Sequence, residues 1–205
     1  MTRTDYYVQL KALARDVRLK HGLTSPKVTL TDMRRIYKSY GVKIVLWKGP
    51  LKDVRGAYIN DDLGPEVMVS ARLPKEQRIF TMGHELKHHL TDPDSGIKLS
   101  AEEKAPIEIG AEIFAAELIF PEADFAAEMA KRGITATNFT PESIVRLKRE
   151  TETTLSFTSL GKRAEFLGFT PKGSLAKTRW KKLEEGLYGE PVYKRIQRIR
   201  AARKK

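Results

Sequence analysis

The spacing of apolar and polar residues predicts that the chain opens with helices and then forms short strands. Four apolar residues near the N-terminus recur at helical spacing: Tyr6, Leu10, Leu13 and Val17. Because they lie between the helix start signal Thr4-Asp5 and the breaker Gly22, they predict one amphipathic helix. A second, shorter helix is expected from about Asp32 to Tyr40, with Gly41 as its left-handed cap.

Three short runs with strand character follow. Val42 to Trp47 is rich in β-branched residues, and further strands are expected at 57–60 and 66–71. The turn-rich residues 61–65 lie between the last two runs. Together these runs predict a small antiparallel sheet.

A helical pattern comes next, beginning near Pro74, which is a favourable first helical residue. Its apolar residues form a stripe at helical spacing: Ile79, Met82, Leu86 and Leu90. This stripe would seat the helix against the sheet. A polar loop is then expected over 91–104, followed by an apolar helix over 107–120 that Pro121 ends.

The C-terminal part of the chain is predicted to be helical. Further helices are expected at roughly 122–132, 141–151, 157–167 and 174–187, before a basic segment whose order the pattern leaves open. The helices between 141 and 167 allow a helix-turn-helix-like pair, but a plain helical appendage is the favoured interpretation. The predicted fold class is therefore α+β, a small antiparallel sheet packed against helices with a helical C-terminal extension.

Composition limits the classes of protein that fit this pattern. A chain of 205 residues, 40% of them hydrophobic, can bury one core, with room for a smaller helical appendage. The sequence has no apolar run of the roughly 18–20 residues that a membrane span needs, and residues 1–5 lack a signal-peptide pattern. We therefore expect a cytoplasmic protein without membrane contact. Because the chain has no cysteine, a transition metal would need histidine and carboxylate ligands.

The net charge of +12 is unevenly distributed along the sequence. Residues 106–128 contain six acidic residues and no basic one, whereas the segment from Met129 onward has a net charge of +12. The acidic segment suits cation binding, and the basic segment suits an anionic partner.

One pentapeptide in the predicted helix after Pro74 points to specific chemistry: His84-Glu85-Leu86-Lys87-His88. Residues four apart lie on the same face of a helix, so His84 and His88 can converge on one metal ion. Glu85 would flank that ion and could accept a proton from water. With this composition the pattern arises by chance in roughly one chain in 150. It therefore favours a zinc-hydrolase site.

A catalytic zinc site needs a third protein ligand, and the sequence offers several. His21 is one candidate, although a position at the end of the first helix favours capping. His89 points about 100° away from the ion and is expected beside the site or on the surface. Glu108 and Glu112 share one face of the next helix, so one could bind the ion and the other could orient a histidine. The alternative is a solvated acidic face, but the apolar surroundings of these residues favour a ligand role.

Two segments, 78–88 and 108–121, resemble the ImmA/IrrE family of bacterial and phage metallopeptidases, which carries RFTLAHELGH-like and ExxANxFAAELLMP-like stretches. The resemblance covers about residues 5–125 and is sharp in these two segments. It implies that Glu108 is the third ligand and that Glu112 occupies a neighbouring position where the family commonly has Asn. Lys87 stands where the family usually has Gly. The implied organisation is a zincin-like metallopeptidase domain over 1–125, a helical extension over 126–190 and a basic tail over 191–205.

The resemblance implies a gluzincin-like zinc endopeptidase. Zn²⁺ would be held by His84, His88 and Glu108, and Glu85 would act as the catalytic base. Three residues are candidates to stabilise the oxyanion, and the sequence does not choose among them: Tyr58, Arg78 and His89. The implied substrate is a protein, an XRE-type helix-turn-helix repressor that controls a stress response or a mobile element. Its cleaved segment could add to an edge strand of the sheet.

Two other functions remain open from the sequence. One is a DNA-associated regulator with a structural or inactive metal site, because seven of the thirteen residues in 193–205 are basic. For this tail, a solvated, frayed terminus is favoured over weak nucleic-acid contact. The other is an antitoxin-like interaction protein that uses the same fold without catalysis.

Overall fold

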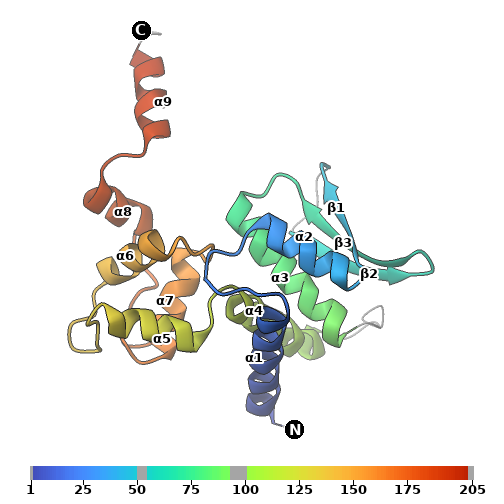
Figure 1. Ribbon diagram of the computed structural model, residues 1–205. Coiled ribbons are helices and arrows are strands. Elements are labelled where there is room, and N and C mark those ends of the chain that lie inside the picture. Colours follow the sequence, from blue (N-terminus) through green and yellow to red (C-terminus); the bar gives the residue numbers. More distant parts are fainter. Residues whose placement is uncertain (1, 50–54, 93–100, 203–205) are drawn as a thin grey trace. The chain divides into compact units, whose positions relative to one another are not determined.

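The computed structural model describes residues 2–49, 55–92 and 101–202 (Figure 1). In chain order, its elements are α1 (Arg3–Lys20), α2 (Leu30–Ser39), β1 (Lys43–Trp47), β2 (Gly56–Asp61), β3 (Gly64–Ser70), α3 (Lys75–Thr91), α4 (Ala101–Ile119), α5 (Glu122–Lys131), α6 (Pro141–Thr151), α7 (Phe157–Phe166), α8 (Trp180–Tyr188) and α9 (Val192–Ala202). Helices and a small three-stranded sheet confirm the predicted α+β class.

The first two helices begin with reciprocal caps. The hydroxyl of Thr2 accepts a hydrogen bond from the backbone N–H of Asp5, whose carboxylate accepts one from the backbone of Thr2. The N-cap, Thr2, therefore lies two residues before the predicted start signal Thr4-Asp5. Thr29 and Asp32 form the same arrangement at α2. Gly41 follows α2 with a φ of 69°, which confirms its predicted left-handed conformation.

The sheet is mixed, so the prediction of an antiparallel sheet is wrong for one strand. β2 and β3 form an antiparallel hairpin through the two-residue turn Asp62-Leu63, but β1 pairs with β3 in parallel. The resulting strand order is β1-β3-β2. β3 carries the fully buried Val67 and Val69, whereas the other two strands are mostly exposed or half-buried. Burial thus favours β3 in the centre, between the hairpin partner and β1.

Helix α3 packs against α2, β2, β3 and α4. Three residues of the predicted stripe, Ile79, Met82 and Leu86, are buried, as expected for a helix seated on the sheet. The helix begins at Lys75, with Pro74 as its N-cap.

Helix α4 begins earlier than predicted. Of the loop predicted over 91–104, residues 101–104 form the first turn of α4, Thr91 ends α3 with Asp92 as its C-cap, and 93–100 lie outside the described residues. Pro106 explains the difference, because a proline normally marks the start of a helix and here lies inside one.

Two close contacts fix how α3 and α4 meet. A Cβ atom on Gly83 would lie 3.2 Å from the Cβ atom of Ala115, so the helices touch with almost no side chain between them. One turn further along α3, the ammonium of Lys87 lies 3.3 Å from the carbonyl oxygen of Ile107. From the first contact to the second, the residue number rises from 83 to 87 on α3 and falls from 115 to 107 on α4. The two helices are therefore antiparallel.

Helix α1 covers another side of α4. A Cβ atom on Gly110 would lie 2.7 Å from Leu10 Cδ1, which shows how closely these helices pack. At the C-terminal end of α4, the buried guanidinium of Arg18 donates hydrogen bonds to the carbonyl oxygens of Leu118 (2.7 Å) and Ile119 (3.1 Å). These oxygens have no partner within the helix, so Arg18 acts as a C-terminal cap supplied by α1.

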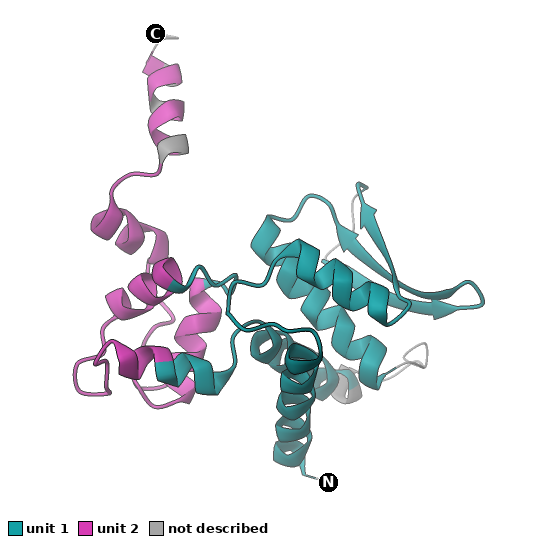
Figure 2. Ribbon diagram, in the orientation of Figure 1, with its two compact units in different colours: residues 1–127, 151–156 teal, residues 128–150, 157–205 magenta. Residues whose placement is uncertain are grey.

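The chain divides into two compact units (Figure 2). Unit 1 comprises residues 1–127 and 151–156, and unit 2 comprises 128–150 and 157–205. Within unit 2, the rings of Phe157 and Trp180 stack with centroids 5.8 Å apart. The last predicted helix begins later than expected, at Trp180, because turns around Gly173, whose φ is 82°, occupy the preceding segment. Residues 192–202, whose order the sequence left open, form α9.

None of the helices described has both the length and the apolar character that crossing a membrane requires.

Replacing Arg18 with Met should lower the free energy of unfolding by about 2–3 kcal/mol, because two buried carbonyl oxygens of α4 lose their donor. Arg35→Met is the matched control, since Arg35 makes an exposed ion pair with Asp32 and should cost at most about 0.5 kcal/mol. Urea unfolding of both variants measures the difference. Equal stability losses would show that the cap is unimportant.

Candidate metal centre

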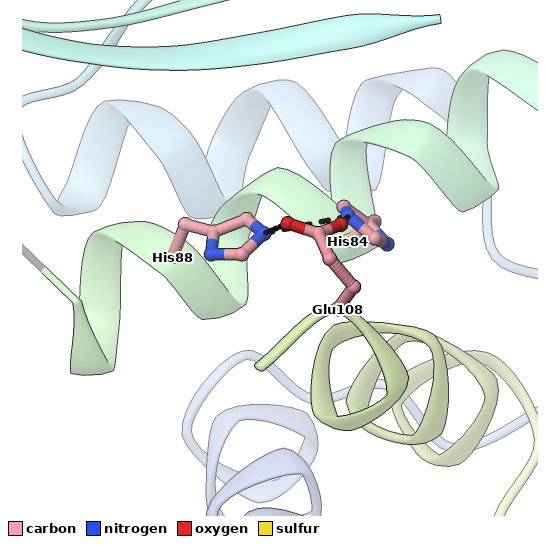
Figure 3. Close-up of side chains that lie close together, drawn as sticks. All are labelled: His84, His88 and Glu108. Carbon is pink, nitrogen blue, oxygen red and sulfur yellow. Dashed lines mark hydrogen bonds and ion pairs between the residues drawn. The ribbon is translucent and has the colours of Figure 1, made fainter. Parts of the chain in front are cut away.

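Three predicted ligands lie together at the contact between α3 and α4. Nε2 of His84 lies 3.1 Å from Oε2 of Glu108 and 3.3 Å from Nε2 of His88. Nε2 of His88 is 3.8 Å from Oε1 of Glu108. The carboxylate of Glu108 reaches from α4 to the two imidazole rings on α3 (Figure 3). Within the described parts of the chain, these residues form a group that could hold a metal ion.

The spacing of these atoms suits a tetrahedral site. Ligands about 2.0–2.1 Å from a zinc ion lie roughly 3.3–3.4 Å from one another at the corners of a tetrahedron. The three separations in the structure bracket that value. A metal ion could therefore replace the present contacts with small side-chain movements, and a fourth corner would stay open.

Asp92 orients one of the histidines, a role that the sequence prediction missed. Its Oδ2 atom lies 2.9 Å from Nδ1 of His88, so the opposite ring nitrogen, Nε2, is the one presented to the site. Burial alone would raise the pKa of Asp92, but hydrogen bonds from His88 and Lys87 outweigh it and lower the pKa. A carboxylate four residues after His88 on a continuing helix was the available signal. The expectation that Glu112 orients a histidine has no support among the hydrogen bonds described.

Lys87 is fully buried and supports both sides of the site. Its ammonium donates hydrogen bonds to Oδ2 of Asp92 at 2.5 Å and to the carbonyl oxygen of Ile107 at 3.3 Å. It also lies 5.7 Å from the centre of the Tyr6 ring. One cation thus links the carboxylate that holds His88 to the backbone next to Glu108.

Glu85 lies beside the histidines in a nearly closed environment. Its side chain is 6% exposed, and burial raises its pKa to about 7, with His88 opposing the rise and Glu108 adding to it. The backbone N–H of Tyr58 on β2 donates a hydrogen bond to it. Gly56 allows this approach, since a Cβ atom there would come within 2.5 Å of Thr81 Cγ2 and 3.1 Å of Glu85 Oε1.

A cleft of about 640 Å³ opens over these residues. It is lined by the start of β2, by α3 and by α4: Arg55, Gly56, Ala57, Tyr58, Phe80, Thr81, His84, Glu85, His88, Lys104, Ile107, Glu108 and Glu112. β2 is an edge strand, so the cleft runs beside a strand that is paired on one side with β3.

The three candidates for stabilising an oxyanion are placed differently. Tyr58 lines the cleft, and its hydroxyl lies 3.1 Å from Nδ1 of His89. His89 itself packs edge-on against the rings of Tyr58 and Tyr40, and burial lowers its pKa. Neither His89 nor Arg78 is among the residues that line the cleft. Of the three candidates, Tyr58 is therefore the one that lines the cleft, and its hydroxyl contacts His89.

The remaining candidate ligands, His21 and Glu112, lie outside the group that His84, His88 and Glu108 form. His21 is the C-cap of α1 and is buried, with Nε2 3.3 Å from the Ser39 hydroxyl. Burial lowers its pKa, and Lys20 lowers it further. Glu112 is exposed and lines the cleft, but it does not belong to the ligand group. Burial and His88 lower the pKa of His84, while Glu108 and Glu112 oppose this effect.

The family of this chain follows from a comparison with known families. The model of the IrrE N-terminal-like domain (Peptidase_M78) matches residues 37–161, more than half of the chain. This chain belongs to that family. The match includes both helices of the candidate site, and membership supports a metallopeptidase-type function.

Comparison with solved structures supports the fold. A Mycobacterium tuberculosis transcriptional regulator is 17% identical to this chain, with a TM-score of 0.55 over 80% of this chain and 50% of its own. The chain thus spans about half the length of that structure, and at this identity the likeness concerns the fold alone. Comparison with curated proteins gave no match.

The Asp92→Asn variant should bind a first-row transition metal about 10–100-fold more weakly, because His88 loses its charged hydrogen-bond partner. Competition with a chromophoric chelator measures this affinity. Asp62→Asn, in the exposed turn between β2 and β3, removes the same charge elsewhere and should leave the affinity unchanged. Unchanged affinity in Asp92→Asn would show that Asp92 does not help His88 to bind the metal.

The raised pKa of Glu85 predicts a pH-dependent stability in the metal-free protein. The folded state binds this proton more tightly than the unfolded state does, so the contribution is full below about pH 4.5 and is lost as the pH rises through about 7. Glu85→Gln does not titrate. Wild-type protein should therefore lose about 1–3 kcal/mol relative to this variant between about pH 4.5 and 8. Urea unfolding with a chelator present measures the difference, and a pH-independent difference would contradict the burial argument.

Proposed function

We propose that the protein is a zinc-dependent endopeptidase that hydrolyses a peptide bond in a protein substrate. The observation that carries this proposal is the meeting of His84, His88 and Glu108 in a cleft that also contains the buried carboxyl of Glu85. Membership of a peptidase family supports it.

The donor set favours zinc. Two imidazole nitrogens and one carboxylate oxygen are typical of catalytic zinc sites, which keep a fourth position open, and the chain has no cysteine to offer instead. The arrangement is gluzincin-like, with two histidines on one helix and a glutamate on the next. When bound, Zn²⁺ supplies a Lewis acid that polarises a carbonyl group and makes water a competent nucleophile near neutral pH.

Glu85 is placed to move the proton. It follows His84 on α3 and lines the same cleft, so it can accept a proton from the attacking water and later pass it to the leaving amine. Its buried carboxyl is held by the backbone N–H of Tyr58, which fixes its orientation. We assign the hydroxyl of Tyr58 as the donor to the developing oxyanion, with Nδ1–H of His89 donating to the tyrosine oxygen so that the single O–H proton is left for the substrate.

The cleft suits an extended peptide. Gly56, Ala57 and Tyr58 of the edge strand β2 line it, and a substrate segment could lie along the edge of that strand that faces away from β3. The resemblance to the ImmA/IrrE family suggests that the substrate is an XRE-type helix-turn-helix repressor, whose cleavage would relieve repression in a stress response or a mobile element. The gene next to the one that encodes this chain is the first source of such a repressor to test.

The test is cleavage of that repressor by purified, zinc-loaded protein. We expect about one zinc per chain, and we expect Glu85→Gln to keep the zinc while its kcat falls by about 10²–10⁴-fold, because the variant cannot accept a proton. Gel electrophoresis and mass spectrometry follow cleavage, and atomic absorption gives the metal content. Undiminished cleavage by the variant would contradict the assignment of the base.

A matched pair of glutamates controls for the ligand assignment. Glu108→Gln should lose zinc and activity together, whereas Glu112→Gln, one turn along the same helix and facing the same cleft, should keep the zinc. The reverse result would make Glu112 the ligand. An intact zinc site without cleavage of any candidate repressor would support the metal site and reject the proposed substrate.

A further inference from the structure

The net positive charge of the protein comes from one of its two units. The 38 basic residues divide equally, 19 in each unit, but 19 of the 26 acidic residues lie in unit 1 and 7 in unit 2. Unit 1, which contains the candidate metal centre, is therefore neutral, and unit 2 carries the whole net charge of +12. Such a division suggests that unit 2 meets a polyanion.

One segment of unit 2 concentrates this charge. We call it the basic run, and it contains five exposed basic residues in Pro171–Leu183: Lys172, Lys177, Arg179, Lys181 and Lys182. The segment contains no acidic residue. Among the described residues, none of the five forms an ion pair. All five side chains are exposed, and Glu142 is the acidic residue that shares a pocket with Arg179 and Lys182.

The nearest acidic residues along the chain are paired with bases outside the run. Glu184 lies 3.8 Å from Arg149 of α6, and Glu185 pairs with Lys194 of α9. Glu165 of α7 accepts a hydrogen bond from the backbone N–H of Leu175 inside the run. The first two carboxylates therefore screen other bases of unit 2 and leave the run positive.

The run is held in place by apolar contacts, unlike a frayed terminus. Leu175 is 8% exposed, and Trp180 stacks on Phe157 at the start of α7. Both side chains fit against Gly161, where a Cβ atom would lie 3.1 Å from Trp180 and 3.3 Å from Leu175. These two anchors flank Lys177 and Arg179, so the basic side chains project from a fixed backbone.

We propose that unit 2 binds the phosphate backbone of nucleic acid through the basic run. Nucleic acid presents a dense, regular array of negative charge that matches five exposed bases in eleven residues. An acidic protein presents fewer charges per unit length, and its contact would also bury apolar groups in the pocket that Arg179 and Lys182 line with Leu183. The inference rests on charge and exposure in unit 2 and is independent of the hydrolase proposal.

The test measures binding of a labelled DNA duplex of about 20 base pairs to the full chain by fluorescence anisotropy. The logarithm of the association constant should fall with the logarithm of salt concentration with a slope near −4.5, the value for about five neutralised phosphates. Replacing all five bases of the run with Gln should weaken binding at least tenfold at about 50 mM NaCl and remove most of that slope. A duplex RNA of the same length, measured in parallel, shows which nucleic acid is preferred.

A control variant removes five exposed charges from unit 1: Arg34, Lys38, Lys48, Arg72 and Lys75, each changed to Gln. It has the same net charge as the run variant and should bind DNA within about twofold of wild type. Circular dichroism and thermal unfolding check that both variants fold. Equal weakening in both would mean that only net charge matters and would overturn the proposal.

Two further outcomes would also overturn it. If Arg195→Gln with Arg200→Gln on α9 abolishes binding while the run variant binds normally, the contact belongs to the C-terminal helix. If polyglutamate competes as well as DNA does at equal charge, the surface is one for acidic proteins.

Discussion

The contact between α3 and α4 determines the candidate site. Where Gly83 faces Ala115, the two helix backbones approach with almost no side chain between them. Because the helices run in opposite directions from that contact, His84 and Glu108 come to lie across from each other within 3.1 Å. A Cβ atom at Gly83 would already lie 3.2 Å from the Cβ atom of Ala115, so a bulky side chain there would push the two helices apart and move Glu108 away from the histidines.

A buried charged side chain, that of Lys87, also holds α3 and α4 together. A fully buried lysine is rare, and it is stable here because Lys87 meets the Asp92 carboxylate, a carbonyl oxygen of α4 and an aromatic face. Asp92 in turn fixes His88. Lys87, which stands where the family usually has Gly, therefore links the two helices that carry the candidate ligands. The acidic residues that line the cleft are balanced by basic residues elsewhere in unit 1, whose net charge is zero.

The sequence predicted the features that depend on local periodicity. The spacing of His84 and His88, the apolar stripe of α3 and the left-handed Gly41 all follow from residues a few positions apart. The parallel pairing of β1 did not, because it depends on which strand buries the most apolar surface. Glu108 needed the family resemblance, since nothing local distinguishes it from Glu112. The role of Asp92 and the burial of Lys87 were not predicted, because acidic and basic side chains are normally exposed. Lys87 is buried because it contacts both Asp92 at the end of α3 and the backbone of α4.

The most direct test of the site is a crystal structure of the zinc-soaked protein, with data collected on both sides of the zinc absorption edge. We expect one anomalous peak bonded to Nε2 of His84, Nε2 of His88 and a carboxylate oxygen of Glu108, at about 2.0–2.2 Å from each. His88 should still be held by Asp92. A peak on Glu112, or the absence of a peak between the two histidines, would show that His84, His88 and Glu108 do not form the zinc site.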